Sequence, residues 1–211
     1  KEVYPGYDAQ YGYELAGMVW FQGWNDMVDR GAYPDRDRPG GYDRYSEALG
    51  HFIRDVRRDL SAPDLPFVIG VIGVGGPVKN YGAAQKRYAG IHQYFRSAMA
   101  APATWPEFDG NVSSVLTENY WDMELTALRA RDAELNQKMK QLVSNGNLQK
   151  KEQQSMREKL RAEMFTKREL ETLQKGVSNQ EYHYLGSAKI MAQIGRGFAE
   201  SMAQLMGPSS N

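Results

Sequence analysis

The chain has 211 residues, 41% of them hydrophobic and 25% charged, which is enough material for one α/β domain with a substantial core. Twenty-six Lys and Arg residues balance twenty-six Asp and Glu residues, so no basic excess indicates binding to nucleic acid or to an anionic membrane. The absence of cysteine excludes disulfides, thiolate metal sites and cysteine nucleophiles. The longest apolar stretch, residues 67–76, is about half as long as a membrane-spanning helix.

The first half of the chain alternates short apolar runs with helical periods. Residues 16–21 and 66–73 predict two buried strands, and residues 111–117 predict a third. Apolar residues recur at helical spacing in residues 45–60 and 88–98, between these strands. Strand, helix, strand, helix, strand at this spacing predicts an α/β fold with a parallel sheet and helices on its faces.

From residue 122 the composition changes. Residues 129–175 contain no proline, one glycine, and twelve Lys and Arg against seven Asp and Glu. A thin apolar seam from Leu128 to Leu142, a turn at residues 144–147 and a polar helical pattern over residues 148–175 predict a protruding antiparallel helical hairpin. Within this pattern Thr166 and Glu169 predict a capping box.

We expect this hairpin, about residues 122–175, to be inserted into a single α/β domain that covers residues 1–211. Residues 190–205 predict a closing helix that ends at Gly207. Solvated helices are the usual explanation of a charged hairpin. Contact with an anionic polysaccharide or with a partner protein is the other interpretation.

The three histidines lie in different settings. His51 and His92 fall inside amphipathic helices, where a surface histidine or a satisfied core histidine is the usual role. His183 falls in a loop, residues 178–186, between a helix end at Gly176 and the start of the last helix near Ser187. Such a loop at the rim of a sheet commonly presents a general base.

Polar residues follow the first predicted strand. Residues 22–26 read Gln-Gly-Trp-Asn-Asp, and ligands bind at this edge of a parallel sheet. Gly23 permits close backbone approach, and the Asn25 side chain offers an amide donor for a developing oxyanion. An Asx turn that caps a short helix is an equal alternative.

These two segments carry a resemblance to a family. Residues 23–26 fit the Gly-x-Asn-Asp block of the SGNH (GDSL-like) hydrolases, and residues 19–23 resemble the strand end of their sialate O-acetylesterase and acetylxylan esterase branch. Residues 183–199 are similar to the last block of that family, in which the catalytic histidine precedes the C-terminal helix. The resemblance covers most of the chain apart from the hairpin.

The resemblance implies a three-layer α/β/α sandwich with a parallel sheet, the flavodoxin-like SGNH hydrolase fold. It implies a carbohydrate O-acetylesterase that acts through a serine ester, with an O-acetylated carbohydrate as substrate, a secreted or periplasmic location, and neither cofactor nor metal. Asn25 then resembles the oxyanion donor, Gly23 part of the same catalytic loop, and His183 the general base. The candidate substrate-binding residues are Gln22, Trp24, Asp26, Tyr182 and Tyr184, with Gln22 and Asp26 also supporting the loop.

Two departures from the family pattern have consequences. The nucleophile block, Gly-Asp-Ser or Gly-Gln-Ser-Asn, is absent, so we expect the chain to be N-terminally incomplete, the serine to lie upstream, and this chain alone to have little or no activity. The family's Asp three residues before the histidine is replaced by Gln180. Glu181, Glu118 and Asp122 are candidate acids, and a Ser-His dyad is another arrangement. A non-catalytic glycan-binding or scaffold module with the same fold is the alternative function.

Overall fold

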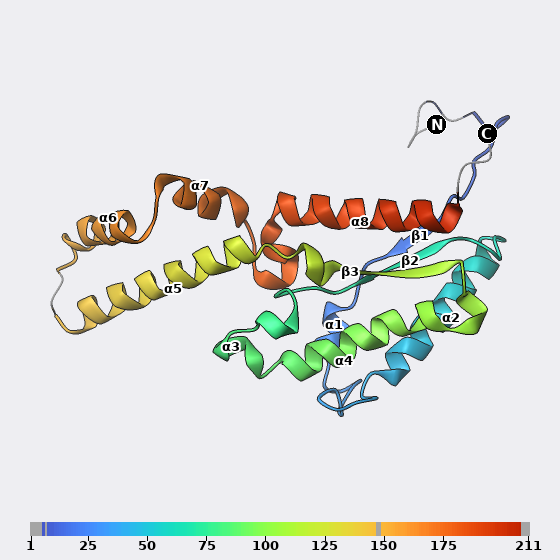
Figure 1. Ribbon diagram of the computed structural model, residues 1–211, viewed down its shortest axis with the longest axis horizontal. Helices are drawn as coiled ribbons and strands as arrows, with labels where there is room; N and C mark the ends of the chain where they lie inside the picture. The colour runs from blue at the N-terminus through green and yellow to red at the C-terminus, as the bar shows by residue number, and fades with distance from the viewer. Residues whose placement is uncertain (1–5, 7, 147–148, 208–211) are drawn as a thin grey trace. The chain divides into compact units, whose positions relative to one another are not determined.

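A computed structural model of the chain describes residues 6, 8–146 and 149–207 (Figure 1). These residues divide into two compact units. The first comprises the chain as far as Ile72, together with Tyr81–Thr117 and the residues from Gly195 onward, and the second comprises Gly73–Asn80 and Glu118–Ile194. The C-terminal helix α8 (Ala188–Met206) therefore contributes residues to both units.

The first unit is built on a parallel sheet of three strands that follow one another in sequence order. Phe67 pairs with Met18 on one side and with Val112 on the other. Every residue of the central strand is buried, as expected for a near-continuous apolar run in a strand that is covered on both faces. The three predicted strands are confirmed, each one or two residues shorter at either end: β1 (Met18–Trp20), β2 (Phe67–Val71) and β3 (Val112–Leu116).

Two helices of the first unit, α2 (Asp43–Asp59) and α4 (Ala89–Ala100), cover one face of this sheet (Figure 1). Phe52 of α2 packs between the rings of Trp20 and Phe67, with ring centroids 4.5 and 6.1 Å away. The ring of Phe95 of α4 is fully buried and lies 4.7 Å from the ring of Tyr45. An aromatic core therefore fixes α2 and α4 against the strands.

The opposite face of the sheet is covered by the part of α8 that follows Gly195 (Figure 1). A side chain at Gly70 would come within 2.7 Å of the Phe198 ring, so the absence of a Cβ there lets the helix approach the strand. The hydroxyls of Ser113 and Ser201 are 2.6 Å apart at the same interface. Helices thus lie on both faces of a parallel sheet, and the predicted α/β sandwich is confirmed.

The second unit is mainly helical and contains α5 (Met123–Ser144), α6 (Gln153–Met164) and α7 (Lys167–Gly176). The predicted apolar seam of α5 packs against α6 and α7, with Leu128, Leu135 and Met139 buried around Phe165. The burial of these side chains explains why an otherwise polar sequence forms stable helices. That the hairpin is an insertion into a single domain stays a prediction.

The second arm of the hairpin differs from the expected continuous pattern over residues 148–175. It is broken at Phe165, which adopts an extended conformation and turns its ring into the cluster. Thr166 then caps α7 in the predicted capping box, because its hydroxyl accepts from the Glu169 amide while the Glu169 carboxylate accepts from the Thr166 amide. Leu148 lies outside the described residues.

The remaining elements are short and connect these parts. None of the described helices combines the length and the apolar character of a membrane span. The short helices are α1 (Trp24–Val28), α3 (Ala83–Lys86), η1 (Val78–Asn80), η2 (Ala101–Thr104), η3 (Pro106–Phe108), η4 (Thr117–Tyr120) and η5 (Glu181–Gly186).

Candidate functional site

The loop after β1 turns directly into the short helix α1, whose N-cap is Gly23. A Cβ at Gly23 would lie 2.8 Å from the buried ring of Phe95 and 3.2 Å from the methyl of Met99. Close packing therefore requires a glycine here, apart from any contact with a substrate. The alternative to an oxyanion loop is an Asx turn that caps a short helix. The short helix is present, but no side chain caps it, so Asn25 and Asp26 do not form a capping Asx turn.

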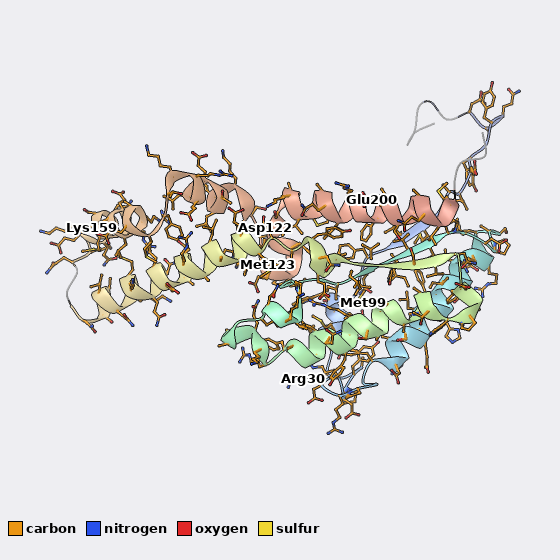
Figure 2. All side chains as sticks on the ribbon, viewed as in Figure 1. Arg30, Met99, Asp122, Met123, Lys159 and Glu200 are labelled. Atoms are coloured by element: carbon orange, nitrogen blue, oxygen red, sulfur yellow. The ribbon has the colours of Figure 1, made fainter. Side chains whose placement is uncertain are left out.

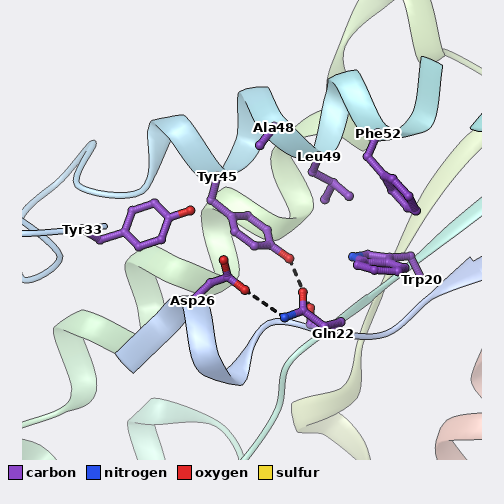
Figure 3. Close-up of a pocket in the computed structure, with 8 residues that line it drawn as sticks. All are labelled: Trp20, Gln22, Asp26, Tyr33, Tyr45, Ala48, Leu49 and Phe52. Atoms are coloured by element: carbon purple, nitrogen blue, oxygen red, sulfur yellow. Dashed lines mark hydrogen bonds between the residues drawn. The ribbon is translucent and has the colours of Figure 1, made fainter. Parts of the chain in front are cut away.

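Hydrogen bonds hold this loop in place. The Gln22 side-chain amide donates to the Asp26 carboxylate at 2.8 Å, and the Tyr45 hydroxyl donates to the Gln22 carbonyl at 3.1 Å (Figure 3). The first bond orients both side chains of the loop, and the second ties the loop to α2. Gln22 and Asp26 are thus joined within the loop, and their contact with a substrate stays a prediction.

Beside this loop lies a pocket of about 230 Å³ (Figure 3). Its walls are aromatic and aliphatic, and its polar groups are the Gln22 amide, the Asp26 carboxylate and tyrosine hydroxyls. An apolar pocket with a few convergent polar groups is the usual form of a small-molecule site, although this one is smaller than the roughly 300–1,000 Å³ of drug-sized pockets. The lining residues are Trp20, Gln22, Asp26, Tyr33, Tyr45, Ala48, Leu49 and Phe52.

The two pocket tyrosines are held in the protonated state. Burial raises the pKa of Tyr45, and the negative charge of Asp26 raises it further. The same two causes, burial first, raise the pKa of Tyr33. Both phenols therefore keep their protons at neutral pH, and the Tyr45 hydroxyl uses its proton in the bond to the Gln22 carbonyl.

Asn25 lies beyond the pocket, in the first turn of α1, with an exposed side chain. Trp24 is partly buried at the start of the same helix. The amide of Asn25 is therefore accessible from solvent, which an oxyanion donor requires.

His183 lies in η5 of the second unit and is exposed. Its ring contacts the exposed ring of Tyr182, with centroids 4.5 Å apart. Asn25 and His183 thus belong to different compact units, and their convergence on one acyl group stays a prediction.

The backbone after His183 is unusual. Tyr184, Leu185 and Gly186 follow one another with φ of 51°, 61° and 61°, in the left-handed region that bulky residues rarely adopt. Two non-glycine residues in this conformation cost about 1–3 kcal/mol each, so the surrounding contacts must impose it.

Those contacts are visible around Tyr184 and Leu185. The Tyr184 hydroxyl accepts from the Gly73 amide at 2.9 Å, and its ring lies 6.0 Å from that of Trp121. Leu185 is fully buried, and its carbonyl accepts from the amides of Ser178 and Asn179. Tyr184 is only 7% exposed and its hydroxyl is bonded to Gly73, so it has a packing role in the structure. Its contact with a sugar stays a prediction.

The candidate acids have other partners in the structure. Glu181 accepts from Arg129 at 2.8 Å. Asp122 accepts from the Leu125 amide, which caps α5, and from Lys189 at 2.7 Å. Burial raises the pKa of Asp122, but the bonds from Lys189 and Leu125 outweigh it and leave that pKa below its usual value. Neither of these two carboxylates is hydrogen-bonded to the His183 ring.

The other two histidines match their expected roles. His92 is partly buried, and its Nδ1 lies 2.6 Å from the hydroxyl of Tyr81. His51 is exposed and lies 3.3 Å from a guanidinium nitrogen of Arg54. Among the described residues, no three His, Asp or Glu side chains gather closely enough to hold a metal ion.

Sequence reasoning missed the α2 side of the pocket. Tyr33, Tyr45 and Phe52 contribute to its wall, although the helical period indicated only packing for residues 45 and 52. One feature of the sequence could have indicated this wall: several large aromatic residues lie within about thirty residues of the Gln22–Asp26 loop.

Residues 6–104 match the family described as carbohydrate esterase, sialic acid-specific acetylesterase. This segment is similar to that family of carbohydrate esterases. The SGNH-like resemblance to the sialate O-acetylesterases is thus confirmed, and the matched esterase segment contains β1, the loop at Gln22–Asp26, the pocket and α4. It ends before β3, so His183 lies outside it. No curated protein and no solved structure matches the chain.

Proposed function

We propose that this chain is the C-terminal part of an SGNH-type carbohydrate esterase that removes O-acetyl groups from a glycan. The main support is the carbohydrate esterase match over residues 6–104, which contains the Gly23–Asp26 loop at the carboxyl end of β1. The pocket beside that loop, with aromatic walls and hydroxyl, amide and carboxylate groups, suits one sugar ring. Export to a secreted or periplasmic location fits a glycan substrate.

The proposed reaction proceeds through an acetyl-serine. A serine supplied upstream of this chain attacks the acetyl carbonyl carbon while His183 takes the hydroxyl proton. The carbonyl oxygen becomes an oxyanion, to which the Asn25 amide and the Gly23 loop donate hydrogen bonds. His183 then returns the proton to the departing sugar hydroxyl. Water, activated by the same imidazole, attacks the acetyl-serine and releases acetate and the serine.

The remaining residues orient the substrate and the base. Gln22 and Asp26 present polar groups to the sugar, and Trp24 and Tyr182 flank it with aromatic rings. The buried Tyr184 holds the segment that carries His183. Glu181 is our first candidate for the acid, provided that it exchanges its partner Arg129 for His183 in the active state. A Ser-His dyad is the arrangement expected if Glu181 keeps its ion pair.

A hydrolysis assay tests this proposal. Joined to a segment that supplies the serine block, the chain should release acetate from 4-nitrophenyl acetate and from an O-acetylated sialic acid, and the chain alone should not. His183→Ala should lower kcat by about 10²–10⁴-fold, because the general base is lost. His51→Ala is the matched control and should keep the wild-type rate, because His51 is exposed and contacts Arg54. A His183→Ala protein with the wild-type rate would show that another group is the base.

A non-catalytic glycan-binding module is the second candidate. Gln180 at the position of the family's acid and the Arg129–Glu181 ion pair favour it. In that case the completed protein binds an O-acetylated glycan without hydrolysing it. Tyr45→Phe then weakens binding, because the loop loses its hydrogen bond to α2. His183→Ala leaves binding unchanged. Acetate release by the completed protein excludes this function.

A further inference from the structure

The positive charge of the hairpin is concentrated at one end. Residues 138–161 contain seven Lys and Arg against two Asp and Glu, a net charge of +5. The flanking residues 129–137 hold two cations against two acids, and residues 162–175 hold three against three. The described residues of this stretch, 138–146 and 149–161, form the hairpin tip. They carry all of the hairpin's excess charge.

Three of the five flanking cations have acidic partners, whereas no cation of the described tip makes an ion pair. Arg129 pairs with Glu181, Arg131 with Glu169 and Lys175 with Glu171. Within the described tip the five lysines are exposed and make no ion pair: Lys138, Lys140, Lys150, Lys151 and Lys159. Arg157 donates to the side-chain oxygen of Asn136 at 2.7 Å, a neutral partner. The positive field of the tip is therefore not cancelled locally.

Figure 2 shows this end of the hairpin, where Lys159 is labelled on α6 and nitrogen-tipped side chains extend outward. The two acids of the tip have neutral partners, because Glu158 accepts from Gln154 and Glu152 from the Gln149 amide, so neither forms an ion pair with a tip cation. The result is a cluster of mobile, strongly hydrated point charges rather than a rigid fork for one ligand group.

The composition of the tip selects among polyanions. Residues 138–161 contain no Phe, Tyr or Trp, so bases of a single-stranded nucleic acid have no ring on which to stack. Leu142, Met156 and Leu160 pack against the apolar cluster around Phe165. The exposed side chain of Val143 alone offers too little apolar surface in the described tip for insertion into a lipid surface. A flexible chain of carboxylates requires neither feature.

We propose that the hairpin tip binds an acidic polysaccharide, a chain of carboxylate-bearing sugars. The choice of a sugar polymer rests on the proposed esterase function, since the matched family acts on sialic acids. Binding is electrostatic and weakens with salt, because exposed charges are screened over about 8 Å at physiological ionic strength. The tip then holds the polymer while acetyl groups are removed elsewhere in the protein.

Two triple variants of equal charge test the location. Lys150→Gln, Lys151→Gln and Lys159→Gln together form the tip variant. Lys167→Gln, Arg168→Gln and Lys175→Gln together form the control, which removes the same three charges from the balanced flank. Binding to polysialic acid, to neutral dextran and to single-stranded DNA is measured at 50 and 300 mM NaCl, with thermal unfolding as the check on folding.

At 50 mM NaCl the wild type and the control variant should both bind polysialic acid at least tenfold more tightly than the tip variant does. Binding should fall at 300 mM NaCl, and dextran should not bind. Equal losses in the two variants would mean that overall charge, not the tip, attracts the polymer. Equal affinity for DNA would overturn the preference for a sugar polymer.

Hydrolysis of 4-nitrophenyl acetate separates this proposal from the esterase proposal. The small ester has no negative charge to be captured, so the tip variant of the completed protein should keep the wild-type rate. Lost polymer binding with intact hydrolysis supports the tip. Retained tip-dependent binding in a protein without hydrolysis would overturn the esterase proposal alone.

Discussion

Gly23 illustrates how packing and function overlap at one residue. It lies in the loop assigned to oxyanion stabilisation, yet its lack of a side chain is already required by the Phe95 ring behind it. The phenyl ring is fully buried and cannot retreat, so a methyl group at this position must displace the loop itself. A glycine at this position is therefore no proof of catalysis.

We predict that Gly23→Ala lowers the free energy of unfolding by about 1–3 kcal/mol, as overpacking in a tight core does. Gly82→Ala is the matched control, because a Cβ there meets nothing within 4 Å and its φ of −71° suits alanine. Chemical denaturation measures both variants. An equal, small effect of the two substitutions would show that the loop has room to move.

Tyr184 and Leu185 show a strained backbone beside the proposed base. Their left-handed conformations are imposed by the buried Leu185 side chain and by the hydrogen bond between the Tyr184 hydroxyl and Gly73. No local sequence pattern indicates this geometry, since Tyr and Leu disfavour it. His183 is consequently presented from a segment that the core of the second unit fixes.

At the scale of the elements, the hairpin depends on its caps and its thin seam. Its seam buries few side chains for its length, so each helix end contributes a large share of the stability. The break at Phe165 creates a new helix start that the Thr166–Glu169 capping box satisfies. The carboxylate of Glu169 also binds Arg131 of α5, which joins the two arms.

Thr166→Ala should lower the stability of the hairpin by about 0.5–2 kcal/mol, because the Glu169 amide at the start of α7 loses its acceptor. Thr172→Ala, in the interior of the same helix, is the control and should be neutral or slightly stabilising, since alanine favours helix. Hydrogen exchange of the α7 amides reports the local change. Faster exchange in the control alone would contradict the capping role.

The hydrogen bonds to Glu169 lower the pKa of its carboxyl group. The hydrogen bond from the Thr166 amide, followed by the bond from Arg131, lowers the pKa of Glu169 to about 2. The carboxylate thus stays charged in mildly acidic solution, and the capping box and the Arg131 bond persist there.

At the scale of the whole molecule, stability should depend on one partly buried histidine. Burial, followed by the charges of Arg96 and Arg36, lowers the pKa of His92 from 6.5 to about 4. The unfolded chain therefore binds a proton between pH 6.5 and 4 that the folded chain does not. The free energy of unfolding therefore has its full value above pH 6.5 and falls as the pH drops toward 4. The fall due to His92 amounts to at most about 3 kcal/mol.

We predict that His92→Gln flattens the fall in unfolding free energy between pH 6.5 and 4, whatever its effect at pH 7. His51→Gln should leave the slope as in the wild type, because His51 is exposed. Carboxylates contribute equally to all three proteins, so the comparison isolates the imidazole. Parallel curves for the wild type and His92→Gln would show that this histidine is protonated before unfolding.

The sequence by itself determined the elements and the class of fold. The apolar run at residues 67–71, the helical period of residues 45–60 and the capping box at Thr166 are local patterns, and local patterns follow from backbone geometry and side-chain spacing. The Gln22–Asp26 loop was also found this way, because its motif is contiguous. Its family match needed nothing beyond the order of residues.

The tertiary structure alone decided which side chains share a pocket and which charges are neutralised. Tyr45 and Phe52 line the pocket beside the Gln22–Asp26 loop only because α2 packs on β1, and Arg129 is neutralised only because Glu181, far along the chain, lies next to it. Tyr184 likewise takes a left-handed conformation because Gly73 and Trp121 hold it. Such properties depend on contacts between distant segments, and residue spacing along a chain carries no direct record of them.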